Sequence, residues 1–208
     1  MGNLSITIGR QFGSGGREIG EKLAEKLGIK CYDKEIIKRA SKDSGVNETL
    51  FENADEKPIN SFLYSIVAHG FPAYSSPVSV DNMYSNDKIF NIQAETIKKI
   101  SAEEPAVFIG RCADDILRDC DKLVTLFIYA NQEDKEKRIS NKYNISQKEA
   151  REMIRKMDKT RSSYYEFFAN RRWGDMNNYM LCVNSSIGID KTVEIVYNYI
   201  VRLGYNEL

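Results

Sequence analysis

The feature that most constrains this chain is a glycine-rich segment near its N-terminus, GRQFGSGGRE at residues 9–18. It follows a short apolar run, LSITIG, that is typical of a buried strand. It precedes a helical pattern with Ile19, Leu23 and Leu27 on one face, which Gly28 would end. Glycines between a strand and a helix let backbone N–H groups turn toward a phosphate, and the positive end of the helix attracts it further. The segment therefore predicts a phosphate-binding loop, with an ordinary tight turn as the alternative.

The rest of the chain alternates between predicted strands and helices. Apolar runs at 106–110 and 123–130 predict strands buried on both faces, as in a parallel sheet covered by helices. The other predicted elements are an extended segment IKCY, a helix capped by Asp33, a helix near 87–102, a helix begun by a capping box of Ser146 and Glu149, a strand at 179–184 and a final helix bearing Val193 and Ile200. This alternation predicts an α/β fold with a doubly wound, five-stranded parallel sheet that binds ligands at the carboxyl ends of its strands.

Composition narrows the class of protein. The chain has 208 residues, 42% of them hydrophobic, so we expect a single domain over 1–208. Thirty basic and thirty acidic side chains cancel, which argues against a nucleic-acid binder. No apolar run is long enough for a membrane span and no signal peptide is evident, so we expect a cytoplasmic protein. The single histidine, His69, and four scattered cysteines leave carboxylates, arginines and backbone amides to carry any chemistry.

Two segments are predicted to lie beside the binding loop. Residues 45–86 hold three of the four prolines and are interpreted as an acceptor-side insertion over a cleft, with an ordinary surface loop as an equal alternative. Residues 132–172 hold twelve Lys or Arg against seven Asp or Glu. That surplus suits a helical lid closing over a triphosphate, although part of it can belong to solvated helix faces. Arg155 and Arg161 are the lid arginines singled out for a role.

The loop departs from the standard GxxxxGK[ST] pattern. With the pattern aligned on Gly15, its lysine position is occupied by Gly16 and its Ser/Thr position by Arg17. The cation that usually reaches the β- and γ-phosphates and the hydroxyl that usually binds Mg²⁺ are therefore both missing. Arg10 or Arg17 could supply the charge, and Ser14 is the nearest hydroxyl for the metal. Binding of phosphate is thus better supported by the sequence than catalysis.

At this point the sequence resembles the cytidylate kinases, and more closely the bacterial cytidylate kinase-like group of P-loop proteins. The resemblance spans nearly the whole chain. Its anchors, in chain order, are GRQFGSGGREIG, YDKEIIKRA, VFIGRCADDIL, DKTRSSYY and VNSSIGIDKTVEIV. It implies a nucleoside monophosphate kinase-like fold with ATP and Mg²⁺ as cofactors and small-molecule nucleotides as partners.

The resemblance also implies roles for individual residues. Those assigned to the ATP phosphates are Arg10, Gly13, Ser14, Gly15, Gly16 and Arg17. Those assigned to the acceptor are Asp33, Arg39, Arg111, Asp158 and Arg161, with Asp158 on the ribose hydroxyls and the arginines on phosphate. The set expected to act in catalysis is Arg17, Arg111, Arg155 and Arg161. Several converging arginines suit transfer between two polyanions, which depends on positioning and charge neutralisation.

One departure from the family bears on the substrate. The family's G-R-D motif reads Gly110-Arg111-Cys112 here, and the resemblance implies that its aspartate contacts cytosine. A cysteine is a weak hydrogen-bond acceptor, so recognition of the base is predicted to be altered. Asp114 and Asp115 are interpreted as ligands of magnesium or of a substrate amine, or else as residues that cap and solubilise the following helix.

The leading hypothesis is an ATP-dependent phosphotransferase that moves the γ-phosphate to a nucleoside monophosphate or a related small acceptor. If the acceptor is an alcohol, Asp33 is the candidate base. The alternative is a non-catalytic nucleotide or anion sensor with a degenerate loop. The sequence indicates neither the acceptor nor the oligomeric state.

Overall fold

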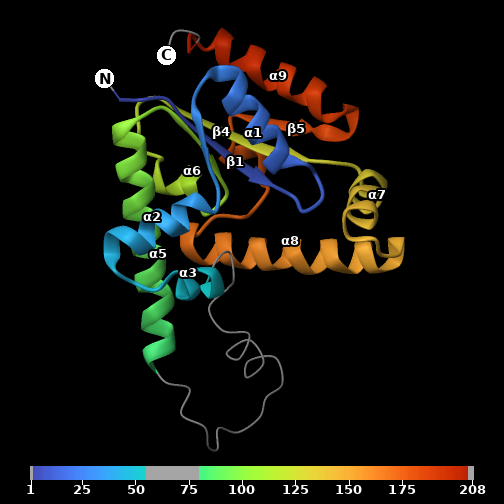
Figure 1. Cartoon of the computed structure of the whole chain (residues 1–208). Helices are drawn as coiled ribbons and strands as arrows, with labels where there is room; N and C mark the ends of the chain where they lie inside the picture. The colour runs from blue at the N-terminus through green and yellow to red at the C-terminus, as the bar shows by residue number, and fades with distance from the viewer. Residues whose placement is uncertain (1, 55–79, 206–208) are drawn as a thin grey trace, which may run out of the picture.

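The computed structural model describes residues 2–54 and 80–205. His69 and most of the predicted insertion at 45–86 lie outside these residues. A five-stranded sheet forms the centre of the molecule (Figure 1), and every paired neighbour in it runs parallel. Its strands, in spatial order, are β2 (Lys30–Tyr32), β3 (Ala106–Ile109), β1 (Ser5–Arg10), β4 (Leu123–Tyr129) and β5 (Leu181–Asn184). The predicted doubly wound α/β fold is confirmed.

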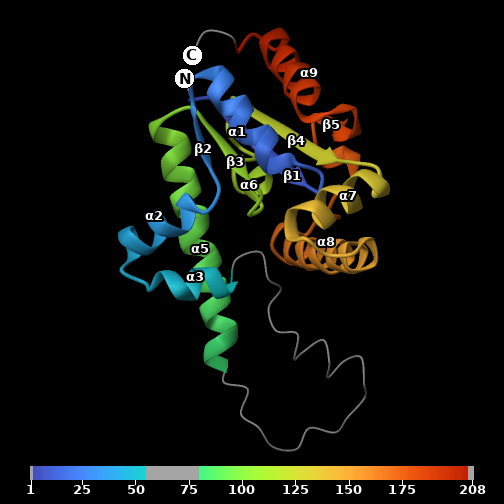
Figure 2. The same cartoon turned by 45° about the vertical axis from the view of Figure 1, so that its right-hand side comes forward.

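Helices cover both faces of the sheet because successive strand residues point to opposite sides. In β3, Val107 and Ile109 join one core with α1 (Gly16–Leu27) and α9 (Ile189–Arg202). Ala106 and Phe108 join a second core on the other face. The helices on that side are α2 (Glu35–Ser44), α5 (Val80–Glu103) and α6 (Ala113–Ile116), with α3 (Glu48–Ala54) packed on α2 and α5. Figure 2 shows the two layers on either side of the strands.

A helical hairpin lies beyond the carboxyl ends of the strands (Figures 1 and 2), where a lid was predicted at 132–172. It consists of α7 (Gln132–Tyr143) and α8 (Gln147–Ala169). The predicted capping box begins α8: the Ser146 hydroxyl accepts from the Glu149 N–H, and the Glu149 carboxylate accepts from the Ser146 N–H at 2.9 Å. Two short 3₁₀ turns, η1 (Met176–Asn178) and η2 (Ser185–Ile187), flank β5.

Two predicted boundaries were wrong. The N-cap of α2 is Lys34, one residue after the expected Asp33, because the Asp33 carboxylate contacts two arginines instead. The helix expected near 87–102 begins seven residues earlier, at Val80.

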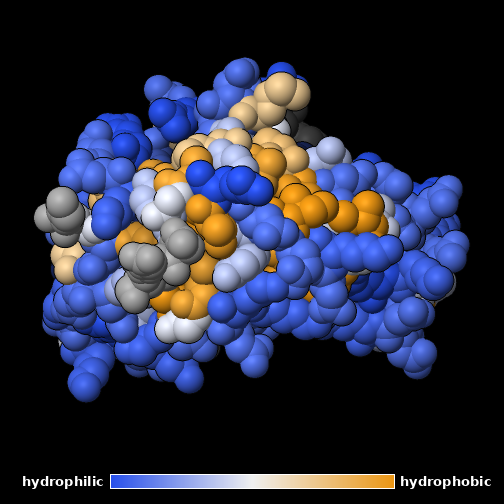
Figure 3. All heavy atoms as spheres, turned by 90° about the horizontal axis from the view of Figure 1, so that it is seen from above, coloured by the Kyte–Doolittle hydropathy of each residue, from blue (hydrophilic) through white to orange (hydrophobic). Residues whose placement is uncertain are grey.

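Most of the surface seen from the α9 side is hydrophilic, with an apolar area near its middle (Figure 3). Exposed apolar side chains on α9 include Ile195. Within the described ranges, no helix combines the length and the apolar composition that a bilayer crossing requires.

Candidate functional site

The glycine-rich loop between β1 and α1 is a tight backbone structure. Gly13 and Gly15 have left-handed φ angles of 83° and 78°, which other residues adopt only with strain. A side chain at Gly15 would also meet Ile189 and come within 2.7 Å of Nη1 of Arg138. The loop opens into the first turn of α1, whose N–H groups have no helical carbonyl to bind. It can therefore present backbone donors to an anion.

Ser14 holds this loop together. Its side chain is fully buried, its hydroxyl donates to the Gln11 carbonyl at 2.8 Å, and the same hydroxyl accepts from the Gly16 N–H at 3.4 Å. The Ser14 carbonyl accepts in turn from the Ser185 hydroxyl at 2.6 Å. The residue considered for Mg²⁺ is thus engaged in the internal bonds of the loop.

The loop also lies where the chain reverses its direction across the sheet. From β1 the chain builds β2 and β3 on one side and then crosses to β4 and β5 on the other. Ligands of open α/β sheets bind at such switch points, outside the carboxyl ends of the strands.

Cations from the helical hairpin reach the loop. On α7, Arg138 donates to the Gly13 carbonyl at 2.9 Å and Lys135 donates to the Gln11 side chain at 3.2 Å. On α8, Arg161 donates to the Arg10 carbonyl at 3.3 Å, and its guanidinium lies 5.6 Å from the centre of the Phe12 ring. Lys135 and Arg138 were missed in the sequence. Their only signal was an i, i+3 spacing beside the buried Ile139.

Asp158 contacts the loop as well. Its Oδ1 accepts the Phe12 N–H at 2.6 Å, and its Oδ2 lies 3.8 Å from Nζ of Lys135. Burial raises the pKa of Asp158, while the Phe12 N–H and Lys135 act in the opposite direction. The structure therefore brings the D-x-x-R pair, Asp158 and Arg161, to the loop. Arg155, one helical turn earlier, is exposed and forms no hydrogen bond or ion pair with the described part of the chain.

A second group of predicted residues lies at the carboxyl ends of β2 and β3. Nη1 of the buried Arg111 donates to Asp33 at 2.9 Å and to the Ile109 carbonyl at 3.2 Å. Arg17, at the start of α1, is 3.4 Å from the other oxygen of Asp33 and donates to Glu21 at 2.9 Å. Asp33 thus bridges two of the predicted arginines.

The backbone that carries Arg111 is strained. Gly110, Arg111 and Cys112 have successive φ angles of 70°, 56° and 55°, all left-handed. Only glycine adopts this region without cost, and non-glycine residues held there cluster at functional sites. The turn directs the Arg111 side chain back along the end of the sheet toward Asp33.

Cys112 and the aromatic residues of α8 form a packed cluster. Cys112 is buried against Tyr164 and Tyr165, so these aromatic side chains pack α8 against the turn that follows β3. Nearby, Asp114 is buried and accepts the Tyr165 hydroxyl at 2.6 Å, and burial raises the pKa of Asp114. These residues adjoin a cavity of about 20 Å³, room for a single water molecule.

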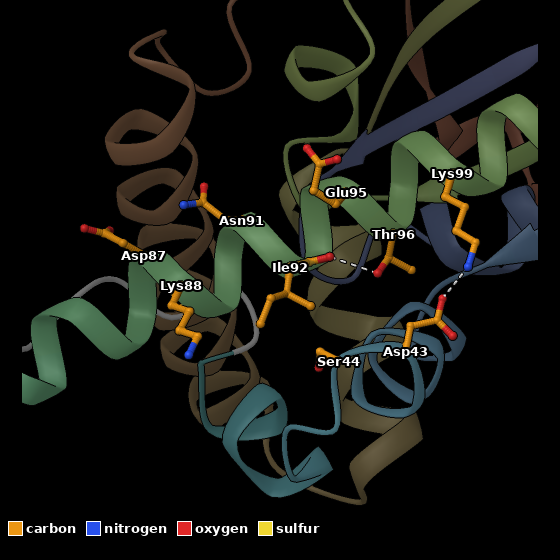
Figure 4. Close-up of a pocket in the computed structure, with 9 residues that line it drawn as sticks. All are labelled: Asp43, Ser44, Asp87, Lys88, Asn91, Ile92, Glu95, Thr96 and Lys99. Carbon is orange, nitrogen blue, oxygen red and sulfur yellow. Dashed lines mark hydrogen bonds and ion pairs between the residues drawn. The ribbon is translucent and has the colours of Figure 1, made fainter.

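Arg39 lies apart from this group. It pairs with Glu103 across the α2–α5 contact. A larger pocket of about 770 Å³ opens between the same two helices (Figure 4), with an ion pair of 2.8 Å between Lys99 and Asp43 at its edge. None of the predicted site residues lines it.

Another pocket, of about 510 Å³, is lined in part by Arg138 and Ser185, the two residues that donate hydrogen bonds to Gly13 and Ser14 of the loop. It lies between α7 and the η2 turn, and its basic residues are Lys137, Arg138 and Lys142. In the described part of the chain, no three His, Cys, Asp or Glu side chains come together as a metal site would require.

The glycine loop at the switch point of a parallel sheet, with cations gathered around it, defines a P-loop kinase-like α/β protein. The chain belongs to the cytidylate kinase-like family, whose family model matches residues 5–187. No curated protein matches it.

Solved structures of similar fold agree with this class. An uncharacterized protein from Eubacterium ventriosum is 28% identical, with a TM-score of 0.68 over 95% of this chain and 98% of its own. A gluconokinase from Sinorhizobium meliloti is 13% identical, with a TM-score of 0.55 over 98% and 94%. A shikimate kinase from Bacteroides thetaiotaomicron is 10% identical, with a TM-score of 0.52 over 95% and 98%. The two kinases show that the fold is shared.

Proposed function

We propose that this protein is an ATP-dependent phosphotransferase that transfers the γ-phosphate to a nucleoside monophosphate or a related small acceptor. The observation that carries the proposal is the position of the glycine loop, which opens at the switch point beside the buried Arg111–Asp33 pair. One anion site and one acceptor site are thereby adjacent. Phosphoryl transfer needs this arrangement because its catalysis is mainly positioning and charge stabilisation.

ATP binds with its phosphates on loop residues 9–17. The left-handed Gly13 and Gly15 and the open first turn of α1 fit a phosphate chain. The base and ribose extend into the 510 Å³ pocket between α7 and η2. Mg²⁺, when bound with ATP, neutralises charge on the β- and γ-phosphates, and this ion commonly keeps several water ligands rather than an all-protein cage.

The acceptor binds at the carboxyl ends of β2 and β3, with Arg111 and Asp33 nearest and Arg161 approaching from α8. Its oxygen attacks the γ-phosphorus, the bond from that phosphorus to the β–γ bridging oxygen breaks, and ADP leaves. A phosphate acceptor needs no base because its oxygen is already ionised. A hydroxyl acceptor gives its proton to Asp33, which Arg111 and Arg17 hold in place.

The second candidate is a sensor that binds the nucleotide without turning it over. The absent loop lysine favours it, as does the Phe12 N–H, which already donates to the Asp158 carboxylate. A sensor would need no acceptor site, however, and the buried Arg111–Asp33 pair has the composition of one.

The two candidates are separated by measuring ADP release from ATP·Mg²⁺ with CMP, dCMP, UMP and AMP, and with cytidine as the hydroxyl counterpart of CMP. We expect acceptor-dependent ADP release. The double variant Arg111→Met/Asp33→Asn, which keeps the charge balance of the buried pair, should lower kcat/KM for the acceptor at least tenfold with little change in ATP affinity. A thermal melt controls for folding. ATP binding without turnover on any acceptor would favour the sensor, and absence of ATP binding would contradict both.

A further inference from the structure

The loop lacks the lysine of the GxxxxGK[ST] pattern, and it also departs from that pattern at the first glycine. In the GxxxxGK[ST] pattern the first glycine precedes the lysine by six positions. With the lysine position at Gly16, that first glycine falls on residue 10, which is an arginine here. The chain therefore carries a cation where the pattern has glycine, and glycine where the pattern has the cation.

The structure gives a steric reason for this exchange. A Cβ atom at Gly16 would lie 2.6 Å from Cβ of Arg10 and 3.1 Å from its Cγ. Both are far below carbon–carbon contact distance. The closer atom is bonded directly to the backbone of β1, so no change of rotamer could move it away. Only one of the two positions can therefore bear a side chain. The Cβ atom of Arg10 occupies the space that a Cβ atom at residue 16 would need.

Arg17, the other candidate for the missing charge, has different partners. Its Nε donates to Glu21 at 2.9 Å and lies 3.4 Å from Asp33, and its side chain is 54% exposed. These contacts direct it along α1 and toward the end of β2. Arg10, by contrast, ends β1 and adjoins the small cavity that Arg111 and Arg161 also line, between the loop and the acceptor residues.

We propose that Arg10 takes the role of the loop lysine and bonds the β- and γ-phosphates of the bound nucleotide, the exchange of side chains between positions 10 and 16 keeping one cation over the loop. This inference rests on the proposed function, since it assumes that the loop binds ATP. The guanidinium offers two parallel donors to phosphate oxygens, whereas an ammonium acts as a point charge.

The test exchanges the two side chains back. We compare the wild type with Arg10→Gly, Gly16→Lys and the double variant Arg10→Gly/Gly16→Lys, measuring ATP and ADP affinities by titration calorimetry and stability by thermal unfolding without nucleotide. Arg17→Ala is the matched comparison, and Arg202→Ala on α9 is a remote arginine control.

Arg10→Gly should weaken ATP binding at least tenfold and ADP binding less, because only ATP has the γ-phosphate. A purely structural role would weaken both alike. Gly16→Lys alone should lower the unfolding temperature, and the double variant should regain both stability and at least tenfold of the lost ATP affinity. Arg17→Ala should weaken ATP binding less than Arg10→Gly does, because Glu21 and Asp33 hold the Arg17 side chain, and Arg202→Ala should leave ATP affinity unchanged.

Several results would overturn the inference. One is an Arg10→Gly variant that binds ATP as the wild type does, or that loses ATP and ADP affinity equally. Another is Gly16→Lys with unchanged stability, which would refute the steric premise. A folded double variant that binds ATP no better than Arg10→Gly would refute the proposed exchange of the cation between positions 10 and 16. If the wild type itself binds no ATP, the proposed function fails, which is a distinct outcome.

Discussion

At the scale of single residues, two carboxylates stand out, the buried Asp114 and the half-buried Asp158, because removal from water disfavours their charged forms. Asp158 is partly compensated by the Phe12 N–H and by Lys135. Asp114 has the Tyr165 hydroxyl as a donor and the carboxylate of Asp115 as a neighbour that raises its pKa further. Asp114 therefore makes the folded state sensitive to pH.

The sign of this effect can be tested with Asp114→Asn. The pKa of Asp114 is raised in the folded state, so its contribution to stability is fully present below the unfolded pKa of about 4 and is lost as pH rises through the folded pKa. An amide resembles the protonated acid and can still accept from Tyr165. We expect the variant to exceed the wild type in free energy of unfolding at pH 7 and to lose that advantage at pH 3.5.

Urea unfolding at a series of pH values measures the difference. Asp119→Asn serves as the control, because the Asp119 side chain is 94% exposed and should show no such trend. A difference between Asp114→Asn and wild type that stays constant with pH would refute the interpretation.

At the scale of elements, the α7–α8 hairpin depends on polar contacts as well as on packing. Arg151 binds Glu136 through two hydrogen bonds of 2.6 and 3.0 Å, and with Gln132 it lowers the pKa of Glu136 to about 2. The apolar contact is small, with Ile139, Ala150 and Ile154 as its buried members.

The cap of α8 is correspondingly important. Ser146→Ala removes the acceptor of the Glu149 N–H and should cost about 1 kcal/mol of stability. The loss should appear first as faster hydrogen exchange in the first turn of α8, ahead of global unfolding. Ser162→Ala is the matched control, because Ser162 lies within the same helix and its hydroxyl donates to the Glu166 side chain rather than capping a helix end. Equal exchange in both variants would contradict the role of the cap.

Elements with strong local signals could be predicted from the sequence. The strands at 106–110 and 123–130 are apolar on both faces because helices cover both, and the Ser146–Glu149 box marks the start of α8 directly. The prediction of Asp33 as the N-cap of α2 was wrong because its carboxylate binds Arg111, which is 78 residues away in the chain. No local sequence pattern encodes such a contact.

The site was predicted unevenly for the same reason. The loop glycines could be identified because strand, glycine and helix follow one another in the chain. In the sequence, Lys135 and Arg138 cannot be told apart from other charged residues on a solvent-exposed helix face. Their role appears only in the structure, where Lys135 donates to the Gln11 side chain and Arg138 to the Gly13 carbonyl. Arg39 matched a family motif, yet its guanidinium pairs with Glu103, the last residue of α5.

At the scale of the whole molecule, the loop is held by contacts from distant parts of the chain. The hairpin contributes Arg138 and Asp158, and the segment after β5 contributes Ser185. A nucleotide bound on the loop should therefore stabilise the sheet and the hairpin together.

This coupling predicts a rise in unfolding temperature with ATP·Mg²⁺. At a nucleotide concentration one hundred times the dissociation constant, the gain should be about 2.7 kcal/mol. Differential scanning calorimetry should show one transition that moves as a unit. Two transitions, with only the first shifted by nucleotide, would mean that the hairpin unfolds independently of the sheet.

The 2.6 Å approach between residue 10 and a side chain at residue 16 also bears on how such a loop can evolve. Two forms of the loop are compared: one with glycine at position 10 and lysine at position 16, and one with Arg10 and Gly16. Single substitutions connect them only through an intermediate with two side chains in one space or through one with no cation at either position. The two positions are therefore epistatic, and each is a poor guide to descent when it is read alone. A search pattern that allows Arg10 with Gly16 as well as glycine with lysine would recover both forms.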